Sequence, residues 1–311
     1  MEFVNCNHCG NADSKVIQSL PDLLLDRKQV VTTLVRCQNC GLIYQNPRPS
    51  IDQMGEHYPP EYDSYAPDPG ARRAGRLMRR VLRYGTRKRA QAVLSYQGRG
   101  RILDVGCSTG AFLLGMRAYP GWELRGVEIS DHAAAIAREQ GLDVFTGTLE
   151  EASFQDGEFD AVTLWDVLEH LHDPAATLRE ILRILKPGGV LVLRVPNHDS
   201  WDARIFGAYW AGLDAPRHMF VFDLRSLRNM LCQAGFEDIK MRSNIGGYPT
   251  FVLSVRFWLT ARNFDSGQQA RVVKWLLSPA ARILTAPLFF LTGLGLRGPQ
   301  VTVRCRKQVS F

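Results

Sequence analysis

The chain has 311 residues, of which 45% are hydrophobic and 22% are charged. This composition supports a folded core and excludes disordered, collagen-like and small disulfide-linked proteins. The length indicates two domains, or one large domain with appendages. The formal net charge of +7 is unevenly distributed, since residues 71–101 carry 11 basic and no acidic side chains, whereas residues 102–200 carry 7 basic and 16 acidic ones. A nucleic-acid partner is therefore indicated only if the basic segments form a binding face.

Two Cys-x-x-Cys pairs dominate the N-terminal region. Cys6 and Cys9 form one pair, Cys37 and Cys40 form the other, and a glycine follows each pair. Four thiolates suit the tetrahedral coordination of zinc and leave no position open for water. The 27 residues between the pairs are compatible with a single zinc site, because closing a longer loop adds little entropic cost. We predict a zinc-ribbon-like module over residues 1–46 that holds a structural Zn²⁺; two unrelated thiol pairs are the alternative.

The first residues have neither the basic segment nor the apolar segment of a signal peptide. We therefore expect a cytoplasmic, reducing location, where paired thiols are metal ligands more often than disulfides. The β-branched residues 29–36 predict a strand that leads into the second cysteine pair.

Residues 47–98 are expected to form a linker or lid followed by a basic helix. The linker is rich in Pro, Tyr and Asp as far as position 69. In residues 71–96, Leu77, Met78, Val81 and Leu82 lie on one stripe and arginines surround them. This helix either covers the sheet of the next domain or faces phosphate groups or an anionic membrane.

From residue 100 onward, short apolar runs alternate with helical segments. The predicted strands cover residues 101–107, 123–129, 142–146, 159–165 and 190–196, and later 236–241 and 301–306. One intervening helix begins after Ser130, and another begins after Asp173 with Pro174 at its first position. Strands that alternate with helices predict right-handed crossovers and a doubly wound, mainly parallel α/β sheet.

A glycine-rich loop follows the first strand of this region. Its sequence, Asp104-Val-Gly106-Cys-Ser-Thr-Gly110, differs from the GxGxxG loop that binds a dinucleotide pyrophosphate. An acid at this place would repel a pyrophosphate, but it suits a ligand that carries an ammonium group. Glu128 ends the second strand, where a carboxylate accepts the ribose hydroxyls of a nucleoside.

With these motifs the chain resembles the class I S-adenosylmethionine-dependent methyltransferases, in particular those of types 11, 12 and 23. The segments that carry the resemblance are ILDVGCSTGAFL, VEIS, FDAVTLWDVLEHLHDP and LKPGGVLVLRVPN. The resemblance implies a seven-stranded Rossmann-like sheet over residues 99–244 and 299–311, with S-adenosyl-L-methionine as cofactor. It also implies a set of cofactor contacts: Asp104, Gly106, Cys107, Ser108, Gly110, Glu128, Ile129, Thr148, Leu149 and Trp165. Thr148 stands where the family often has an aspartate that reaches the adenine.

Three residues after the fourth strand bear on the acceptor. The segment lacks the Asn/Asp-Pro-Pro-Tyr/Phe motif of nucleobase amine methyltransferases. Asp166, Glu169 and His170 resemble instead the acid-x-x-Glu-His set of ubiquinone-type O-methyltransferases, in which a divalent ion assists. The alternative is that Glu169 and His170 only open a helix.

A second histidine lies in the segment Pro216-Arg217-His218, which resembles one found in zinc-ribbon-bearing bacterial methyltransferases. The resemblance suggests that Arg217 holds an anionic group and that His218 is the base. A purely structural pair is the alternative. His218, His170 and Arg217 are thus the catalytic candidates.

Residues 245–298 form an unusual insert before the last strand. Residues 240–311 carry 11 basic side chains and a single acid, Asp265, and residues 283–296 are an uncharged apolar run of 14 residues. A spanning helix needs about 20 apolar residues. We expect an element that lies in an anionic membrane interface; a buried core or oligomer contact and a true span are the alternatives.

The sequence therefore predicts a methyltransferase that modifies an oxygen or carbon atom of a small or lipid-linked acceptor, such as a sugar or a prenylated aromatic. The expected location is cytoplasmic, with peripheral attachment to the inner face of the plasma membrane as an option. One alternative is an RNA methyltransferase that grips phosphates with the zinc module and the basic helix. The other is a non-catalytic zinc-ribbon adaptor with a degenerate cofactor fold, against which the intact Asp104 and Glu128 argue.

Overall fold

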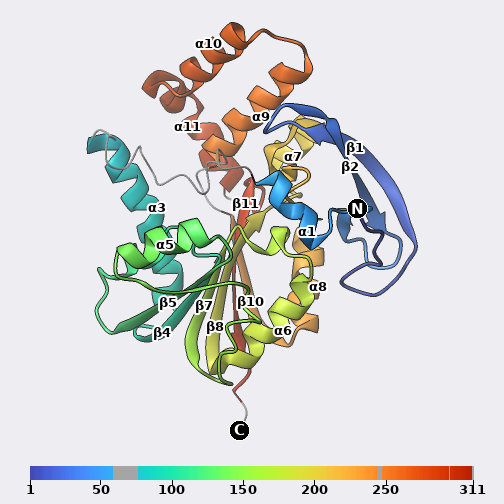
Figure 1. Ribbon diagram of the computed structural model, residues 1–311. Helices are drawn as coiled ribbons and strands as arrows, with labels where there is room; N and C mark the ends of the chain where they lie inside the picture. Colours follow the sequence, from blue (N-terminus) through green and yellow to red (C-terminus); the bar gives the residue numbers. More distant parts are fainter. Residues whose placement is uncertain (59–75, 244–246, 294, 310–311) are drawn as a thin grey trace.

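A seven-stranded sheet forms the centre of the molecule (Figure 1). The computed structural model describes residues 1–58, 76–243, 247–293 and 295–309, with side chains from residue 85 in the first helix after the gap. The strand order is β10-β11-β8-β7-β4-β5-β6. The strands are β4 (Gly100–Val105), β5 (Trp122–Glu128), β6 (Asp143–Thr146), β7 (Phe159–Trp165), β8 (Leu185–Pro196), β10 (Phe236–Ser243) and β11 (Gln300–Lys307). β4 to β8 pair in parallel and β11 is antiparallel to both neighbours, which confirms the predicted doubly wound sheet.

Helices cover both faces of this sheet. On one face lie α3 (Arg76–Leu94), α4 (Ala111–Met116) and α5 (Asp131–Glu139), and on the other lie α6 (Pro174–Ile184) and α8 (Leu224–Gln233). The predicted caps are confirmed, since Ser130 accepts the backbone N–H of Ala133 and Asp173 accepts that of Ala176. Residues 59–75, which include most of the predicted linker, and the side chains of the apolar stripe of the basic helix lie outside the described part of the chain.

β8 begins five residues earlier than predicted. α6 ends at Ile184, and Leu185 already pairs with Phe159 of β7. Pro187 and the two glycines after it cannot continue a helix, so the chain becomes extended and reaches the sheet before the apolar run.

A second, four-stranded sheet joins the N-terminal residues to a later part of the chain. Its order is β1 (Ser14–Asp22), β2 (Arg27–Cys37), β3 (Ile43–Gln45) and β9 (Phe220–Val221), all antiparallel. β2 confirms the strand predicted before the second cysteine pair. β9 lies two residues after His218, so this sheet brings the N-terminal module to the catalytic candidates.

Short helical segments connect these elements. They are α1 (Ile51–Met54), η1 (Gly55–His57), η2 (Leu168–His170), α7 (Trp201–Phe206), η3 (Gly207–Tyr209) and η4 (Ala211–Leu213). η2 follows β7 directly at its carboxyl end, and η4 precedes the Pro216-Arg217-His218 segment.

The insert before β11 is helical. It consists of α9 (Tyr248–Ala261), α10 (Ser266–Leu276) and α11 (Pro279–Gly293), and α10 and α11 project beyond the rest of the molecule (Figure 1). The insert leaves β10 and returns to β11 at the carboxyl end of β8, where Asn197 donates to the carbonyl of Leu296. In the described part of the chain, no single helix has the length and apolar character needed to cross a membrane; α10 and α11 have them only as a pair, and a 68° bend separates the two.

Candidate functional site

The glycine loop after β4 presents bare backbone at the carboxyl end of the sheet. Gly106 and Gly110 have φ angles of 69° and 81°, in the left-handed region that favours glycine. A Cβ atom on Gly106 would lie 2.6 Å from a methyl group of Val167, and one on Gly110 would overlap the side chain of Leu142. Only glycine fits at either place, so a ligand can approach the main chain closely.

Two buried carboxyl groups flank this loop. Asp104 accepts the hydroxyl of Thr163 at 2.6 Å, and burial raises its pKa to about 7. Glu128 accepts the backbone N–H groups of Ser108 and Ser130 at 2.8 and 2.9 Å, and burial raises its pKa as well. A buried acid with a raised pKa gains strongly from a cationic partner. The pair therefore suits a ligand that carries both an ammonium group and hydroxyls.

Trp165 closes the other side of the loop. Its ring lies 5.2 Å from that of Phe112, and the guanidinium of Arg89 lies over it at 5.3 Å. Its indole N–H is buried and has no hydrogen-bond partner among the described residues. Arg89, on α3, interacts electrostatically with Asp104. The sequence did not single out Arg89, because the segment around it carries so many other basic residues.

The remaining predicted cofactor residues lie in the segments that follow β4, β5 and β6. Ile129, directly after Glu128, is 67% exposed, which is unusual for an isoleucine beside a buried sheet. Cys107 and Leu149 are buried. Thr148 donates its N–H to the carboxylate of Glu151 and accepts that residue's N–H on its hydroxyl, so it shapes the turn after β6. The exposed apolar Ile129 offers a surface for a flat ring.

A second cluster lies where η2 meets the loop before β9. The ligand atoms of Glu169, His170 and His218 all lie within 4.8 Å of one another. The two imidazole rings are 4.5 Å apart and nearly perpendicular. His218 Nδ1 lies 2.9 Å from the carbonyl of Gly212 and must donate to it, so Nε2 is the free nitrogen. That Nε2 lies 4.0 Å from a carboxylate oxygen of Glu169 and 4.0 Å from one of Asp214.

The other two members of the cluster differ in burial, since Glu169 is buried and His170 is half-buried. His170 Nδ1 lies 2.9 Å from the hydroxyl of Tyr58, and burial together with His218 lowers the pKa of His170 to about 3. Burial, and then the nearby Asp166, raise the pKa of Glu169 well above its ordinary value. Neither carboxyl oxygen of Glu169 has a hydrogen-bond partner among the described residues. Because buried polar groups are normally hydrogen-bonded, we expect a polar group of a ligand beside Glu169.

The structure does not bring together the predicted divalent-ion ligands Asp166, Glu169 and His170 as one group. Asp166 turns to Arg194, whose Nε donates to both of its oxygens at 3.0 Å, and it also accepts from Gln300. Glu169 and His170 meet His218 instead. Sequence spacing alone did not reveal this, because His218 lies 48 residues beyond His170.

Arg217 is fully buried and forms ion pairs with carboxylates of the protein itself. Its guanidinium forms ion pairs with Asp22 at 2.8 Å and with Asp214 at 2.7 Å. Asp22 ends β1, and Gln45 of β3 donates its amide to the carbonyls of Pro216 and His218. The N-terminal strands therefore hold the loop that carries His218.

The four cysteines of the N-terminal module converge. Their sulfur atoms all lie within 4.8 Å of one another, with Cys6–Cys40 and Cys9–Cys37 each at 3.5 Å. Such spacings fit four thiolates around one Zn²⁺, for which Zn–S bonds are about 2.3 Å. The glycines that follow the pairs, Gly10 and Gly41, have φ angles of 73° and 82°, as these tight turns require.

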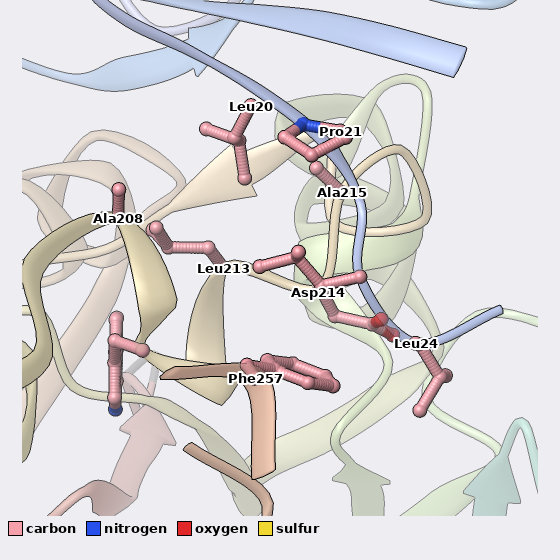
Figure 2. A pocket seen from close by; sticks show the side chains of 10 residues that line it. Leu20, Pro21, Leu24, Ala208, Leu213, Asp214, Ala215 and Phe257 are labelled. Atoms are coloured by element: carbon pink, nitrogen blue, oxygen red, sulfur yellow. The ribbon is translucent and has the colours of Figure 1, made fainter. Parts of the chain in front are cut away.

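A small apolar cavity lies beside the histidine loop. Its lining comes from the tip of β1, the η3–η4 region and α9, as Figure 2 shows. The lining residues are Leu20, Pro21, Leu23, Leu24, Ala208, Trp210, Leu213, Asp214, Ala215 and Phe257. Its volume of about 10 Å³ holds one water molecule at most. The acceptor therefore does not fit there, although Asp214 joins the cavity to the His218 cluster.

Known proteins are similar to this chain in sequence. The sequence model of a family described as a methyltransferase domain matches residues 70–241. The ubiquinone biosynthesis O-methyltransferase of Alkalilimnicola ehrlichii is 38% identical over 128 residues, which are 38% of this chain and 51% of that protein. The demethylmenaquinone methyltransferase of Staphylococcus saprophyticus is 28% identical over 187 residues, covering 52% of this chain and 80% of that protein. The chain thus spans about half the length of the first of these relatives.

A solved structure has the same fold. A SAM-dependent methyltransferase from Thermotoga maritima superposes with a TM-score of 0.50 at 23% identity, covering 73% of this chain and 91% of that one. The family match covers more than half of the chain and includes both the glycine loop and the histidine cluster. The chain therefore belongs to the methyltransferase domain family.

Proposed function

We propose that this protein transfers a methyl group from S-adenosyl-L-methionine to an oxygen or carbon atom of a small or lipid-linked acceptor. The observation that carries the proposal is the proximity of two clusters at one edge of the sheet. Gly106 of the cofactor loop is packed against Val167, two residues before Glu169 of the histidine cluster. A cofactor on the loop would thus lie beside groups that can take a proton.

The loop residues divide the recognition of the cofactor among them. Asp104 binds the ammonium group, Glu128 binds the ribose hydroxyls, and the backbone of Gly106 and Gly110 approaches the methionine portion. Arg89 stands over Trp165 and beside Asp104, a position that suits the cofactor's carboxylate. When bound, S-adenosylmethionine supplies a methyl group on a sulfonium.

Ile129 and Thr148 complete the recognition on the side of the adenine. The exposed side chain of Ile129 covers one face of the ring. The hydroxyl of Thr148 serves where relatives have an acid. Leu149 and Cys107 close the site from below as buried apolar residues.

His218 is the base in this proposal. Its Nδ1 is committed to the carbonyl of Gly212, so Nε2 carries the lone pair that accepts the acceptor's proton. Asp214 lies 4.0 Å from Nε2 and stabilises the imidazolium that forms. Glu169, whose pKa burial and Asp166 raise well above its ordinary value, offers its unpartnered carboxyl group to the acceptor as a hydrogen-bond partner. Arg217 is a positioning residue, because its guanidinium is bound to Asp22 and Asp214.

The acceptor class rests on the relatives. Their names assign them to ubiquinone biosynthesis and to demethylmenaquinone, both prenylated quinone-related compounds. A prenylated aromatic or another lipid-linked acceptor agrees with the apolar insert, whose α9 packs against the loop before His218, where Ser254 accepts the N–H of Ala211. The cysteine cluster holds a structural Zn²⁺ in this proposal.

The test separates cofactor binding from methyl transfer. Labelled S-adenosylmethionine is incubated with the full chain and a lipid extract from cells that lack this protein. The turnover of the His218→Asn variant is compared with that of His132→Asn. His132 is exposed on α5 and lies outside the Glu169–His170–His218 cluster, so it serves as the matched histidine control. We expect His218→Asn to bind the cofactor normally in calorimetry but to transfer label about 10² to 10⁴ times more slowly.

Three results would contradict the proposal. Full turnover by His218→Asn would show that His218 is not the base, and loss of turnover in a chelator at an unchanged Tm would indicate that the Glu169–His170–His218 cluster holds a cation instead. Absence of any S-adenosylmethionine binding by the wild type would overturn methyl transfer altogether and favour an adaptor.

A further inference from the structure

The outward side of α11 is apolar where a surface helix is normally polar. Ile283, Leu284, Leu288 and Leu291 are 74, 73, 55 and 65% exposed. Their spacing places them on one side of the helix, which we call the α11 outer face. The polarity pattern is therefore reversed relative to a helix that covers a soluble domain.

Exposed apolar and basic side chains also occur along α10, just after it and at the start of α11. Trp275 and Leu277 are 56 and 48% exposed. Arg271, Lys274 and Arg282 are exposed beside them. From residue 266 to residue 311 the sequence has no Asp or Glu at all. Within α10 and α11 all charged side chains are basic, the acidic Asp265 being the N-cap residue before α10. An apolar surface accompanied by such cations is complementary to an anionic lipid surface.

The geometry fits a helix pair that lies on a membrane rather than in it. α10 and α11 are bent by 68° relative to each other, and neither one can span a bilayer. Tryptophan beside basic side chains is the usual composition at the level of the lipid headgroups.

The face also lies on the side of the molecule that carries the site. α9 to α11 extend from the carboxyl ends of the parallel strands (Figure 1). The chain leaves α11 and is fixed at the end of β8 by Asn197, which donates to the carbonyls of Leu296 and Gly298. Docking of α11 would therefore turn the cofactor loop and His218 toward the membrane.

We propose that the α11 outer face, together with Trp275 and Leu277, docks on the surface of an anionic lipid bilayer. The apolar side chains enter the boundary between headgroups and acyl chains, while Arg271, Lys274 and Arg282 contact lipid phosphates. This inference does not depend on the proposed methyl transfer, because vesicle binding is measured without cofactor or acceptor.

The test is flotation of the full chain with vesicles of phosphatidylcholine alone or of phosphatidylcholine with phosphatidylglycerol. We expect the wild type to float with the anionic vesicles and far less with the neutral ones. Ile283→Glu/Leu284→Glu should lower the partition coefficient at least tenfold, because the membrane no longer buries these two large apolar side chains. Arg271→Glu/Lys274→Glu should lower it on anionic vesicles by a similar factor.

The matched control is Val16→Glu/Val31→Glu. These valines are 61 and 57% exposed on the β1–β2 hairpin, in a different sheet, and their change should leave flotation unaltered. An unchanged circular dichroism spectrum and Tm show that each variant is folded. Failure of the wild type to bind anionic vesicles would overturn the inference. So would a wild-type dimer in light scattering that Ile283→Glu/Leu284→Glu dissociates, because the face would then belong to a second copy of the chain.

Discussion

At the scale of single residues, the site is built at a cost to stability. Asp104 is 2% exposed, and burial raises its pKa to about 7 from an ordinary value near 3.8. The folded state therefore binds this proton more tightly than the unfolded chain does. The free energy of unfolding falls as the pH rises from about 4 to 7, and the full cost persists above pH 7.

Asp104→Asn should remove the destabilisation caused by the buried carboxylate and should also abolish cofactor binding. At pH 8 we expect the free energy of unfolding to rise by up to about 4 kcal/mol, at about 1.4 kcal/mol per pKa unit, and the gain to shrink toward pH 4. Urea unfolding at pH 8 and pH 5 measures it, and calorimetry should show no S-adenosylmethionine binding. A variant less stable than the wild type at pH 8 would show that the carboxylate is already stabilised in the free protein.

How much of the site the sequence reveals depends on how far apart its parts lie along the chain. Gly106 and Asp104 belong to one continuous loop, and Glu128 ends the neighbouring strand, so the order of the strands alone brings them together. Arg89 and Asp22 were missed, because each reaches the site from a distant element whose packing leaves no local pattern.

At the scale of elements, the β1–β2 hairpin supports the loop that carries His218. Asp22, at the end of β1, is 1% exposed and accepts hydrogen bonds from Arg217 and from Arg27. The sequence predicted β2 from its β-branched residues, but it did not predict that the hairpin would reach a loop almost 200 residues away. This contact depends on the tertiary structure and leaves no periodic signal in the sequence.

Asp22→Asn should therefore lower turnover without affecting the cofactor. Removing one charge of a buried pair leaves Arg217 partly uncompensated, which typically costs about 3–5 kcal/mol of stability, and it loosens the segment that holds His218. We expect kcat to fall at least tenfold while the dissociation constant for S-adenosylmethionine stays unchanged. Asp26→Asn on the same turn, where the side chain is exposed, is the control. An equal loss of cofactor binding would mean that the variant is simply misfolded.

At the scale of the whole molecule, the two sheets share one hydrophobic core. Cys6, Cys37 and Tyr44 of the N-terminal region are buried in the same cluster as Leu168 and Phe220. β3 pairs with β9 across the same boundary. The cysteine cluster is therefore a part of the main core. The sequence predicted a small separate module, because the linear spacing of cysteines carries no information about what packs on them.

Loss of the proposed Zn²⁺ should consequently destabilise the entire protein in a single step. Structural zinc contributes several kcal/mol or more to folding, and 1 kcal/mol shifts the Tm by roughly 2–4 °C in a chain of this class. We expect Cys37→Ser, or a strong zinc chelator, to lower the Tm of one calorimetric transition by on the order of 10 °C. Cys232→Ser is the control, since Cys232 is exposed and distant from the cluster. Two separate transitions, with the upper one unmoved by the chelator, would instead mean that the N-terminal strands fold independently and that the shared core contributes little to cooperativity.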